Sequence, residues 1–222
     1  MDSDIADPVS GASIKDTGES GELICRSPFP SMPIFLWGDE GGKKYKETYF
    51  ERFENIDVWA QHDWTSRNPV TGGFQIHGRS DGVLNPSGIR FGSAEIYAVS
   101  EGPAFIDDIS ETLCVGRKRK GDGDEVVFLF VKMAKGRVFT AELVQRLRTA
   151  IRAALSSRHV PKFILEVPEI PATINGKKVE IAVKQIISGR KDIKVSSTVA
   201  NPRSLDYFYR FVDYEGERQS KL

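Results

Sequence analysis

A polar, glycine-rich run from Gly78 to Tyr97 separates two parts of the chain whose hydrophobic patterns differ. Before the run, short alternating segments broken by prolines and glycines predict strands; after it, segments of helical and strand period alternate. The run itself combines glycines with Arg79, Asp81 and Arg90. Glycine allows close backbone approaches, and arginine presents forked donors to phosphate or carboxylate oxygens. The run is therefore typical either of an anion site or of a glycine-rich turn with two solvated arginines.

The part before the run predicts a small β-rich unit. Gly21–Cys25 is apolar and ends before a group of prolines, and Met32–Trp37 is a second apolar candidate strand. Val58–Trp64 and Arg67–His77 alternate like the two arms of a hairpin, with Asn-Pro and Gly-Gly in its turn. The other segments expected here are a polar lead-in loop over residues 1–20 and a short aromatic helix over Tyr45–Phe53.

The part after the run predicts a compact α+β unit. Ser93 can cap a helix that ends before Gly102, and Thr140 can cap a longer helix whose apolar residues recur at helical spacing. Apolar segments of strand length surround that second helix. The remaining predicted elements are strands over Glu111–Gly116, Glu125–Met133 and Lys162–Val167, a helix over Val179–Ile187, and a helix that starts at Pro202.

The charge balance argues against a general attraction to polyanions, because 31 Lys and Arg residues face 31 Asp and Glu residues in 222 positions. The basic turn Arg117–Gly123 is followed by acidic residues, which favours a solvated hairpin tip over a nucleic-acid contact. Cys25 and Cys114 lie far apart among apolar neighbours, as buried free thiols in a reducing compartment do. No apolar run approaches the length of about 18 residues that a membrane span needs. We expect a cytosolic protein without nucleic-acid, membrane or metal sites.

Two further polar positions could carry chemistry. Lys177 follows Asn175-Gly176 between a predicted strand and a predicted helix, so its ammonium group can reach a neighbouring site and neutralise negative charge. An ordinary Asn-Gly turn with solvated lysines is the alternative. Asp63 lies at a predicted strand end, where its carboxylate can meet a ligand or can cap a turn.

Three motifs in order resemble the carboxy-terminal part of the adenylate-forming acyl-CoA synthetase superfamily, and most closely its acetoacetate-activating branch. They are Gly78–Gly88, Asn175–Lys184 and Asn201–Leu205, preceded by the hairpin that carries Asp63. The match extends from about Gly11 onward. The resemblance implies that residues 1–80 are the truncated, β-rich end of a large adenylating domain. It also implies that residues 81–222 form a mobile lid domain, a three-stranded sheet with helices and a terminal helical extension.

The resemblance further implies a reaction in two halves. A carboxylate such as acetoacetate attacks the α-phosphate of ATP, with Mg²⁺ present, to give an acyl-adenylate, and the CoA thiol then displaces AMP. Lys177 matches the lysine that enters the site for adenylation, and Asp81 matches the hinge about which the lid turns. The binding positions that the resemblance implies are Asp63 for the ribose, Arg79 for the ribose and phosphate side, Ser87, Gly88 and Arg90 near the pantetheine thiol, and Arg152 for a CoA phosphate.

The chain departs from the superfamily in two places. Where relatives commonly have a glycine before the ribose-binding aspartate, this chain has His62, so either the turn tolerates a side chain or ribose binding is perturbed. The superfamily's phosphate loop and adenine segment have no counterpart in residues 1–77, so ATP and Mg²⁺ would be bound mainly by a preceding part. Two hypotheses remain: the carboxy-terminal portion of an acid–thiol ligase that is inactive alone, or a standalone non-catalytic module that binds nucleotide, CoA or a protein.

Overall fold

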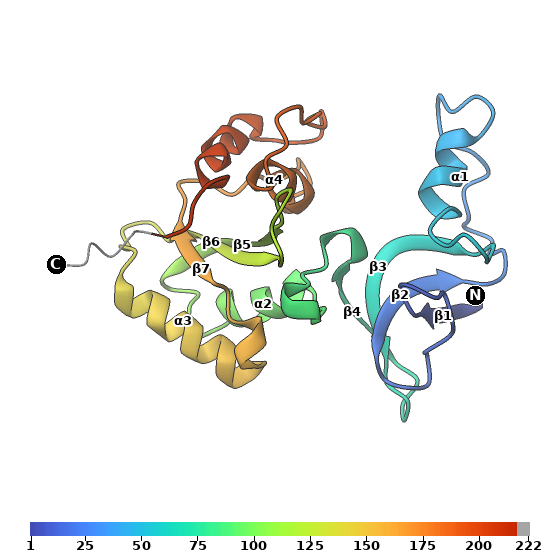
Figure 1. The fold of residues 1–222 in the computed structure, drawn as a ribbon, viewed down its shortest axis with the longest axis horizontal. Coiled ribbons are helices and arrows are strands. Elements are labelled where there is room, and N and C mark those ends of the chain that lie inside the picture. The colour runs from blue at the N-terminus through green and yellow to red at the C-terminus, as the bar shows by residue number, and fades with distance from the viewer. Residues whose placement is uncertain (217–222) are drawn as a thin grey trace. The chain divides into compact units, whose positions relative to one another are not determined.

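The computed structural model describes residues 1–216 of the chain. These residues divide between two compact units, Met1–Val83 and a second unit that begins at Leu84 (Figure 1). The division lies close to the boundary between residues 80 and 81 that the sequence predicts. The assignment of the two units to a large-domain end and a lid stays a prediction.

A four-stranded antiparallel sheet forms the first unit. Its strands are β1 (Ser3–Ala6), β2 (Ser20–Cys25), β3 (Trp59–Arg67) and β4 (Phe74–Arg79), in that spatial order. A small apolar core supports the sheet and consists of Ala6, Ile24, Phe53, Val58 and Ala60. The predicted hairpin is confirmed as β3 and β4, and the first predicted strand is confirmed as β2.

The polar start of the chain contains a strand that the sequence analysis did not predict. Ser3–Ala6 pairs with β2 as β1, although residues 1–20 were expected to form a loop. The buried carboxylate of Asp4 receives a hydrogen bond from Arg26 Nε at 2.6 Å and one from the Ser13 hydroxyl at 2.8 Å. An aspartate with such partners is compatible with a buried strand, because burial is costly only for an unpaired charge.

The segment between β2 and β3 also differs from the prediction. Met32–Trp37 forms bends and irregular backbone, not a strand. Pro33 has no N–H to donate to a sheet, and Trp37 is 97% exposed, so the segment has neither ladder bonds nor a buried face. The predicted aromatic helix exists as α1 (Lys43–Tyr49), which ends earlier than expected. The Tyr49 ring stacks on Trp59 of β3, with the ring centres 3.9 Å apart.

The second unit is built on a three-stranded sheet. β5 (Ile109–Arg117) pairs antiparallel with β6 (Val126–Met133), and β7 (Phe163–Glu166) pairs parallel with β6. Successive side chains of a strand point to opposite faces, so a continuously apolar strand supplies two cores. Leu129 of β6 lies in one core, and its neighbours Phe128 and Phe130 lie in the other. All three predicted strands are confirmed.

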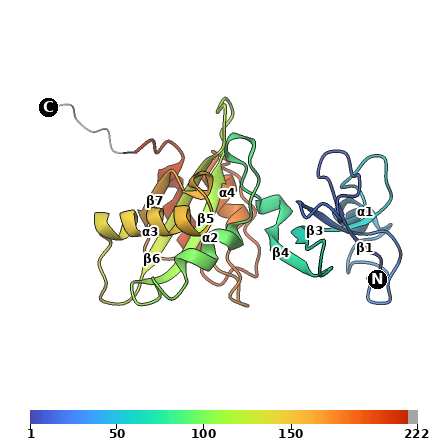
Figure 2. The ribbon, with the colours of Figure 1, turned by 90° about the horizontal axis from the view of Figure 1, so that it is seen from below.

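Helices cover both faces of this sheet (Figures 1 and 2). α2 (Ser93–Ser100) and α3 (Ala141–Ala154) pack Ile96, Leu147 and Ile151 into the core that contains Leu129. The opposite core receives apolar side chains from α4 (Glu180–Ile187) and from the 3-10 helix η4 (Pro202–Phe211). The α+β class predicted from the sequence is confirmed.

The two predicted helix caps have different outcomes. Thr140 caps α3, because its hydroxyl oxygen accepts the Leu143 N–H at 3.2 Å. Ser93 does not cap α2: the cap residue is Gly92, whose N–H donates to the Glu95 carboxylate at 2.9 Å. The Ser93 hydroxyl instead donates to Glu180 at the start of α4, at 2.9 Å.

Cys25 and Cys114 are free and buried, as the sequence predicts. Among residues 1–216, no helix combines the length and apolar character that a membrane crossing requires.

Candidate functional site

Asp63, Arg79 and Asp81 meet at one end of the β3–β4 hairpin. Asp63 on β3 lies opposite Arg79, the last residue of β4, and Asp81 follows in the 3-10 turn η1 (Ser80–Gly82). The Arg79 guanidinium donates from Nε to Asp81 Oδ1 at 3.1 Å and from Nη2 to Asp81 Oδ2 at 3.0 Å. This two-point pairing raises the pKa of Arg79 and ties the start of the glycine-rich run to the hairpin.

Asp63 is a half-buried carboxylate to which no donor among residues 1–216 is hydrogen-bonded. Burial raises its pKa above the ordinary value, while the nearby Arg79 guanidinium opposes that rise and Asp81 adds to it. A carboxylate that is partly removed from water and short of donors can accept hydrogen bonds from the hydroxyls of a ligand.

His62 takes a backbone conformation that favours glycine. Its φ is 62°, in the left-handed region, and its Nε2 lies 3.1 Å from the carbonyl oxygen of Thr48. Of the two alternatives left by the sequence, the structure supports a backbone that tolerates a side chain, but His62 lies within strand β3 and not in a turn. The histidine keeps the glycine-type backbone immediately before Asp63.

Ser87, Gly88 and Arg90 lie on a loop that Leu84 and Phe91 close. These two end residues exchange backbone hydrogen bonds of 3.0 Å in both directions. Ser87 has a φ of 53°, Gly88 follows with a φ of 81°, and all three predicted site residues are exposed. The loop therefore presents these residues to solvent from a closed backbone ring.

Two acidic residues that the sequence analysis missed hold this loop. Asp124 accepts the Ser87 N–H and the Ser87 hydroxyl, each at 2.7 Å, and these hydrogen bonds lower the pKa of Asp124. Glu125 accepts the Asn85 N–H at 2.7 Å and pairs with Lys184 of α4 at 3.2 Å. The available signal was the acidic pair after the basic turn, which we interpreted as solvation.

Lys177 lies at the turn of a small hairpin that Ala172 and Lys178 close. The Thr173 N–H donates to the Lys177 carbonyl at 2.8 Å, and Gly176 supplies the positive φ of 73° that the turn needs. The Lys177 side chain is exposed, and its ammonium group makes no hydrogen bond or ion pair with residues 1–216. The backbone is fixed, but the charge is uncompensated.

The third sequence motif supports the same hairpin. Asn201 accepts the Ala172 N–H at 2.9 Å and donates from Nδ2 to the Ile170 carbonyl at 2.9 Å. The Ile174 N–H donates to the Thr198 carbonyl at 2.8 Å. Asn201 thus holds the strand that leads into the Lys177 turn.

The residues after Lys177 are attached to α2, which the sequence analysis did not foresee. Tyr97 of α2 donates to Glu180 at 2.6 Å and accepts the Cys114 N–H of β5 at 2.9 Å. The Lys178 ammonium lies 3.6 Å from the centre of the Tyr97 ring and is paired with Glu101. Burial raises the pKa of Tyr97 well above its ordinary value, and the adjacent Glu180 carboxylate adds to this rise, so the hydroxyl stays protonated.

Arg152 lies apart from these groups, on the exposed side of α3. Its guanidinium has no partner among residues 1–216. Two other arginines of the helix are engaged: Arg146 donates to Asp108 at 3.0 Å, and Arg148 donates to the Pro161 carbonyl at 3.0 Å. Of the arginines on α3, Arg152 is thus the one whose donors are open to a ligand.

Apart from Arg152, the predicted residues therefore form two groups. Asp63, Arg79 and Asp81 are gathered in the first unit. In the second unit, the loop of Ser87 and the hairpin of Lys177 are joined through α2, because Ser93 and Tyr97 both donate to Glu180.

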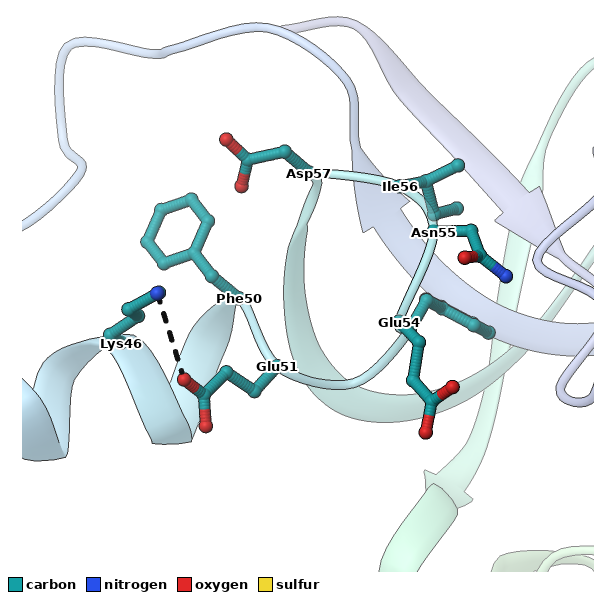
Figure 3. A pocket seen from close by; sticks show the side chains of 8 residues that line it. Lys46, Phe50, Glu51, Glu54, Asn55, Ile56 and Asp57 are labelled. Atoms are coloured by element: carbon teal, nitrogen blue, oxygen red, sulfur yellow. Dashed lines mark ion pairs between the residues drawn. The ribbon is translucent and has the colours of Figure 1, made fainter.

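Neither metal binding nor the surface pocket drawn in Figure 3 gives a further candidate. Among residues 1–216, no group of three or more His, Cys, Asp or Glu side chains could hold a metal ion. A surface pocket of about 640 Å³ in the first unit contains none of the predicted site residues (Figure 3). It is lined by Lys46, Phe50, Glu51, Phe53, Glu54, Asn55, Ile56 and Asp57.

Residues 106–177 match the family model of the AMP-binding enzyme C-terminal domain. The acetoacetyl-CoA synthetase of Gallus gallus is 53% identical over 86% of this chain, and that of Rhizobium meliloti is 44% identical over 86%. In both cases the match covers 28% of the relative, so the chain spans little more than a quarter of the length of these curated relatives.

Solved structures give a consistent result. Acetoacetyl-CoA synthetase from Streptomyces lividans is similar with a TM-score of 0.80 and 36% identity, over 94% of this chain and 30% of that one. MatB from Rhodopseudomonas palustris, solved with ATP bound, shares the fold with a TM-score of 0.64 at 17% identity, over 85% of this chain and 34% of that one. The chain belongs to the adenylate-forming enzymes and corresponds to the carboxy-terminal part of their acetoacetyl-CoA synthetases.

Proposed function

We propose that the chain supplies the carboxy-terminal portion of an acetoacetate–CoA ligase. In the first half-reaction, a carboxylate oxygen of acetoacetate attacks the α-phosphorus of ATP, and pyrophosphate leaves. In the second, the CoA thiol attacks the acyl carbon of the adenylate, and AMP leaves. The preceding portion of the enzyme is required for both steps, so the chain is expected to be inactive alone.

The observation that carries this proposal is the uncompensated ammonium group of Lys177 on a fixed hairpin. Negative charge builds up on the α-phosphate as the carboxylate attacks, and a positioned cation stabilises that charge. Lys177 would act in adenylation and leave when the second unit turns about Asp81. Neighbouring Lys178 cannot take this role while it is paired with Glu101.

The other site residues would bind rather than react. Asp63 would accept hydrogen bonds from the ribose hydroxyls, and Arg79 would donate to the ribose and phosphate side of the nucleotide. Ser87, Gly88 and Arg90 would line the path of the pantetheine thiol. Arg152 would meet a CoA phosphate.

Mg²⁺ is expected to accompany ATP, but residues 1–216 hold no metal-ligand cluster for it. We assign its binding to the preceding portion of the enzyme, because the superfamily's phosphate loop has no counterpart in residues 1–77. The partners of this portion are small molecules: acetoacetate or a similar short carboxylate, ATP and CoA. Buried free thiols at Cys25 and Cys114 favour a reducing compartment such as the cytosol.

The alternative is a non-catalytic module that binds a nucleotide, CoA or a protein. A chimera distinguishes the two, with this chain in place of the matching portion of the Gallus gallus synthetase. We expect the chimera to form acetoacetyl-CoA, and the isolated chain to show no acetoacetate-dependent exchange between ATP and pyrophosphate.

The chimera also defines what would contradict the proposal. An inactive chimera whose second unit is folded, as judged by amide protection in β5 and β6, would favour the module. Exchange by the isolated chain would overturn the view that the preceding portion is indispensable.

A further inference from the structure

Two of the three residues after Lys177 hold its backbone in place, and both contact the side chain of Tyr97. Lys178 lies over the Tyr97 ring, and Glu180 accepts the Tyr97 hydroxyl. We infer that Tyr97 is a positioning residue for Lys177: together with Lys178 and Glu180 it forms a clamp that holds the Lys177 hairpin on α2. This inference rests on the proposed function of Lys177.

The clamp attaches to α2 and β5 at several points. The Tyr97 hydroxyl accepts the Cys114 N–H at 2.9 Å and donates to Glu180 at 2.6 Å, so it links β5 to α4. The ring face is an additional attachment, because an ammonium group is attracted to the electron-rich face of an aromatic ring. Ser93 adds a second hydroxyl to the same Glu180 oxygen at 2.9 Å.

Glu101 completes the attachment of Lys178. It is the C-cap residue directly after α2, and its Oε1 accepts the Thr112 N–H of β5 at 2.7 Å and forms the ion pair with Lys178. The ammonium of Lys178 is therefore held between a carboxylate and a ring, both anchored to the sheet. Its side chain is 24% exposed, so solvent only partly screens this pairing.

This arrangement explains why two adjacent lysines differ. The contacts of Lys178 hold the hairpin backbone in place. Lys177 can therefore present its charge to a ligand while the hairpin stays fixed. Adenylation requires the ammonium group to reach the reacting phosphate with small positional error, and a misplacement of about 1 Å can cost about 10²-fold in rate. A hairpin released from α2 keeps the lysine but loses its placement.

The clamp also joins the two functional segments of the second unit. α2 begins directly after the loop that carries Ser87, Gly88 and Arg90, and α4 begins directly after the Lys177 hairpin. The hydrogen bonds from Ser93 and Tyr97 to Glu180 keep these two segments in one fixed relation. The adenylating group and the CoA-facing loop would consequently turn as one body.

Four variants of the chimeric synthetase test the clamp. Tyr97→Phe removes the hydroxyl and keeps the ring, Lys178→Met removes the ammonium at similar length, and Glu180→Ala removes the acceptor. Glu180→Gln keeps an oxygen that can accept from Tyr97 and Ser93. Tyr207→Phe is the matched control, because the half-buried Tyr207 of η4 has a hydroxyl without a hydrogen bond to residues 1–216.

The readouts are the two half-reactions, measured separately, and the thermal midpoint of the second unit. We expect the first three variants to lower acetoacetate-dependent ATP–pyrophosphate exchange by about 10- to 100-fold. Formation of the thioester from preformed acetoacetyl-adenylate should change by no more than about twofold. Glu180→Gln should restore most of the exchange activity lost in Glu180→Ala, and Tyr207→Phe should leave both half-reactions unchanged.

Lys177→Ala in the same chimera distinguishes failure of the clamp from failure of the proposed function. If Lys177→Ala abolishes exchange and the clamp variants do not reduce it, Tyr97 is not a positioning residue and the inference fails alone. If the clamp variants lower both half-reactions equally, in proportion to the loss of thermal midpoint, the role is structural only and the inference also fails. If Lys177→Ala leaves exchange intact, the proposed function itself fails.

Discussion

At the scale of single residues, the candidate site stands out by charges that lack partners. Asp63 is half-buried and lies near Arg79 but receives no hydrogen bond from residues 1–216, and the Lys177 ammonium has neither a hydrogen bond nor an ion pair with these residues. Most other charges near them are engaged, as in the pairs Arg79–Asp81 and Lys178–Glu101. An ionised group that folding leaves short of partners is unfavourable for stability, and such groups are characteristic of binding sites.

Replacing Asp63 by asparagine should stabilise the first unit near neutral pH. Because burial raises the pKa of Asp63, the folded chain holds this proton more tightly than the unfolded chain does. The resulting stability is complete below the unfolded pKa of about 3.9 and is lost as the pH rises through the raised folded pKa. Asp63→Asn removes this loss, so its advantage in urea unfolding should be largest at about pH 7 and should shrink toward about pH 4.

The exposed Asp57 provides a control for this comparison. Asp57→Asn should give no such pH-dependent difference from the parent chain. A parent chain more stable than Asp63→Asn at neutral pH would show that Arg79 more than offsets the burial of Asp63.

At the scale of elements, the candidate loop that carries Ser87 is held by two acidic residues of the β5–β6 hairpin. Glu125 reaches from the start of β6 to the Asn85 N–H, and its side chain lies over Gly116 of β5. A Cβ at Gly116 would come within 1.8 Å of the Glu125 carboxylate and within 2.7 Å of its Cγ. The Glu125 side chain would therefore be displaced, and the Asn85 N–H would lose its hydrogen-bond acceptor.

Gly116→Ala should therefore act through Glu125. We expect Gly116→Ala and Glu125→Ala each to lower the free energy of unfolding of the second unit by about 1–3 kcal/mol. In the Glu125→Ala background, Gly116→Ala should cost less than about 1 kcal/mol, because the group it displaces is already absent.

Gly123 offers the matched control, since a Cβ there meets no atom within 4 Å. Gly123→Ala should change unfolding by no more than about 0.5 kcal/mol. Strictly additive effects of Gly116→Ala and Glu125→Ala would contradict the proposed contact.

The strands and helices that were predicted most accurately are those that a local sequence pattern determines by itself. The alternation on either side of Asn-Pro and Gly-Gly located β3 and β4, and the apolar spacing of Leu143, Leu147 and Ile151 located α3. β1 was missed because the charge of Asp4 is compensated by Arg26, which lies far along the chain. Met32–Trp37 was wrongly assigned because its apolar residues Ile34, Phe35 and Trp37 are exposed.

The candidate site was only partly predictable for the same reason. A glycine-rich turn identifies Ser87 and Gly88 from the local sequence, and the preceding Asn-Gly pair identifies Lys177. Their supports are distant in sequence: Ser87 is held by Asp124, and Glu180 is held by Tyr97. The spacing of residues along the sequence does not predict hydrogen bonds between segments that are distant in the chain.

At the scale of the whole molecule, the chain consists of two units with cores of unequal size. The first unit has one small cluster under a four-stranded sheet, and the second has a cluster on each face of its sheet. The larger apolar burial of the second unit predicts a higher free energy of unfolding. The Gallus gallus relative is more than three times as long as the part of it that matches this chain.

Native-state hydrogen exchange should resolve the two units in the isolated chain. We expect the slowest exchange at the amides of β5 and β6, and markedly faster exchange in β1 and β4 at the edges of the first sheet. Equal protection in all four of these strands would show that the chain opens as one cooperative body.

The most direct test of the proposed role is the effect of Lys177→Ala on the two half-reactions of the chimeric synthetase. Removal of this ammonium should lower acetoacetate-dependent ATP–pyrophosphate exchange by at least about 10²-fold, the size typical for a lost group that stabilises developing charge. Transfer of the acyl group from preformed acetoacetyl-adenylate to CoA should stay within about twofold of the parent. Equal loss in both half-reactions, or undiminished exchange, would contradict the role of Lys177 in adenylation.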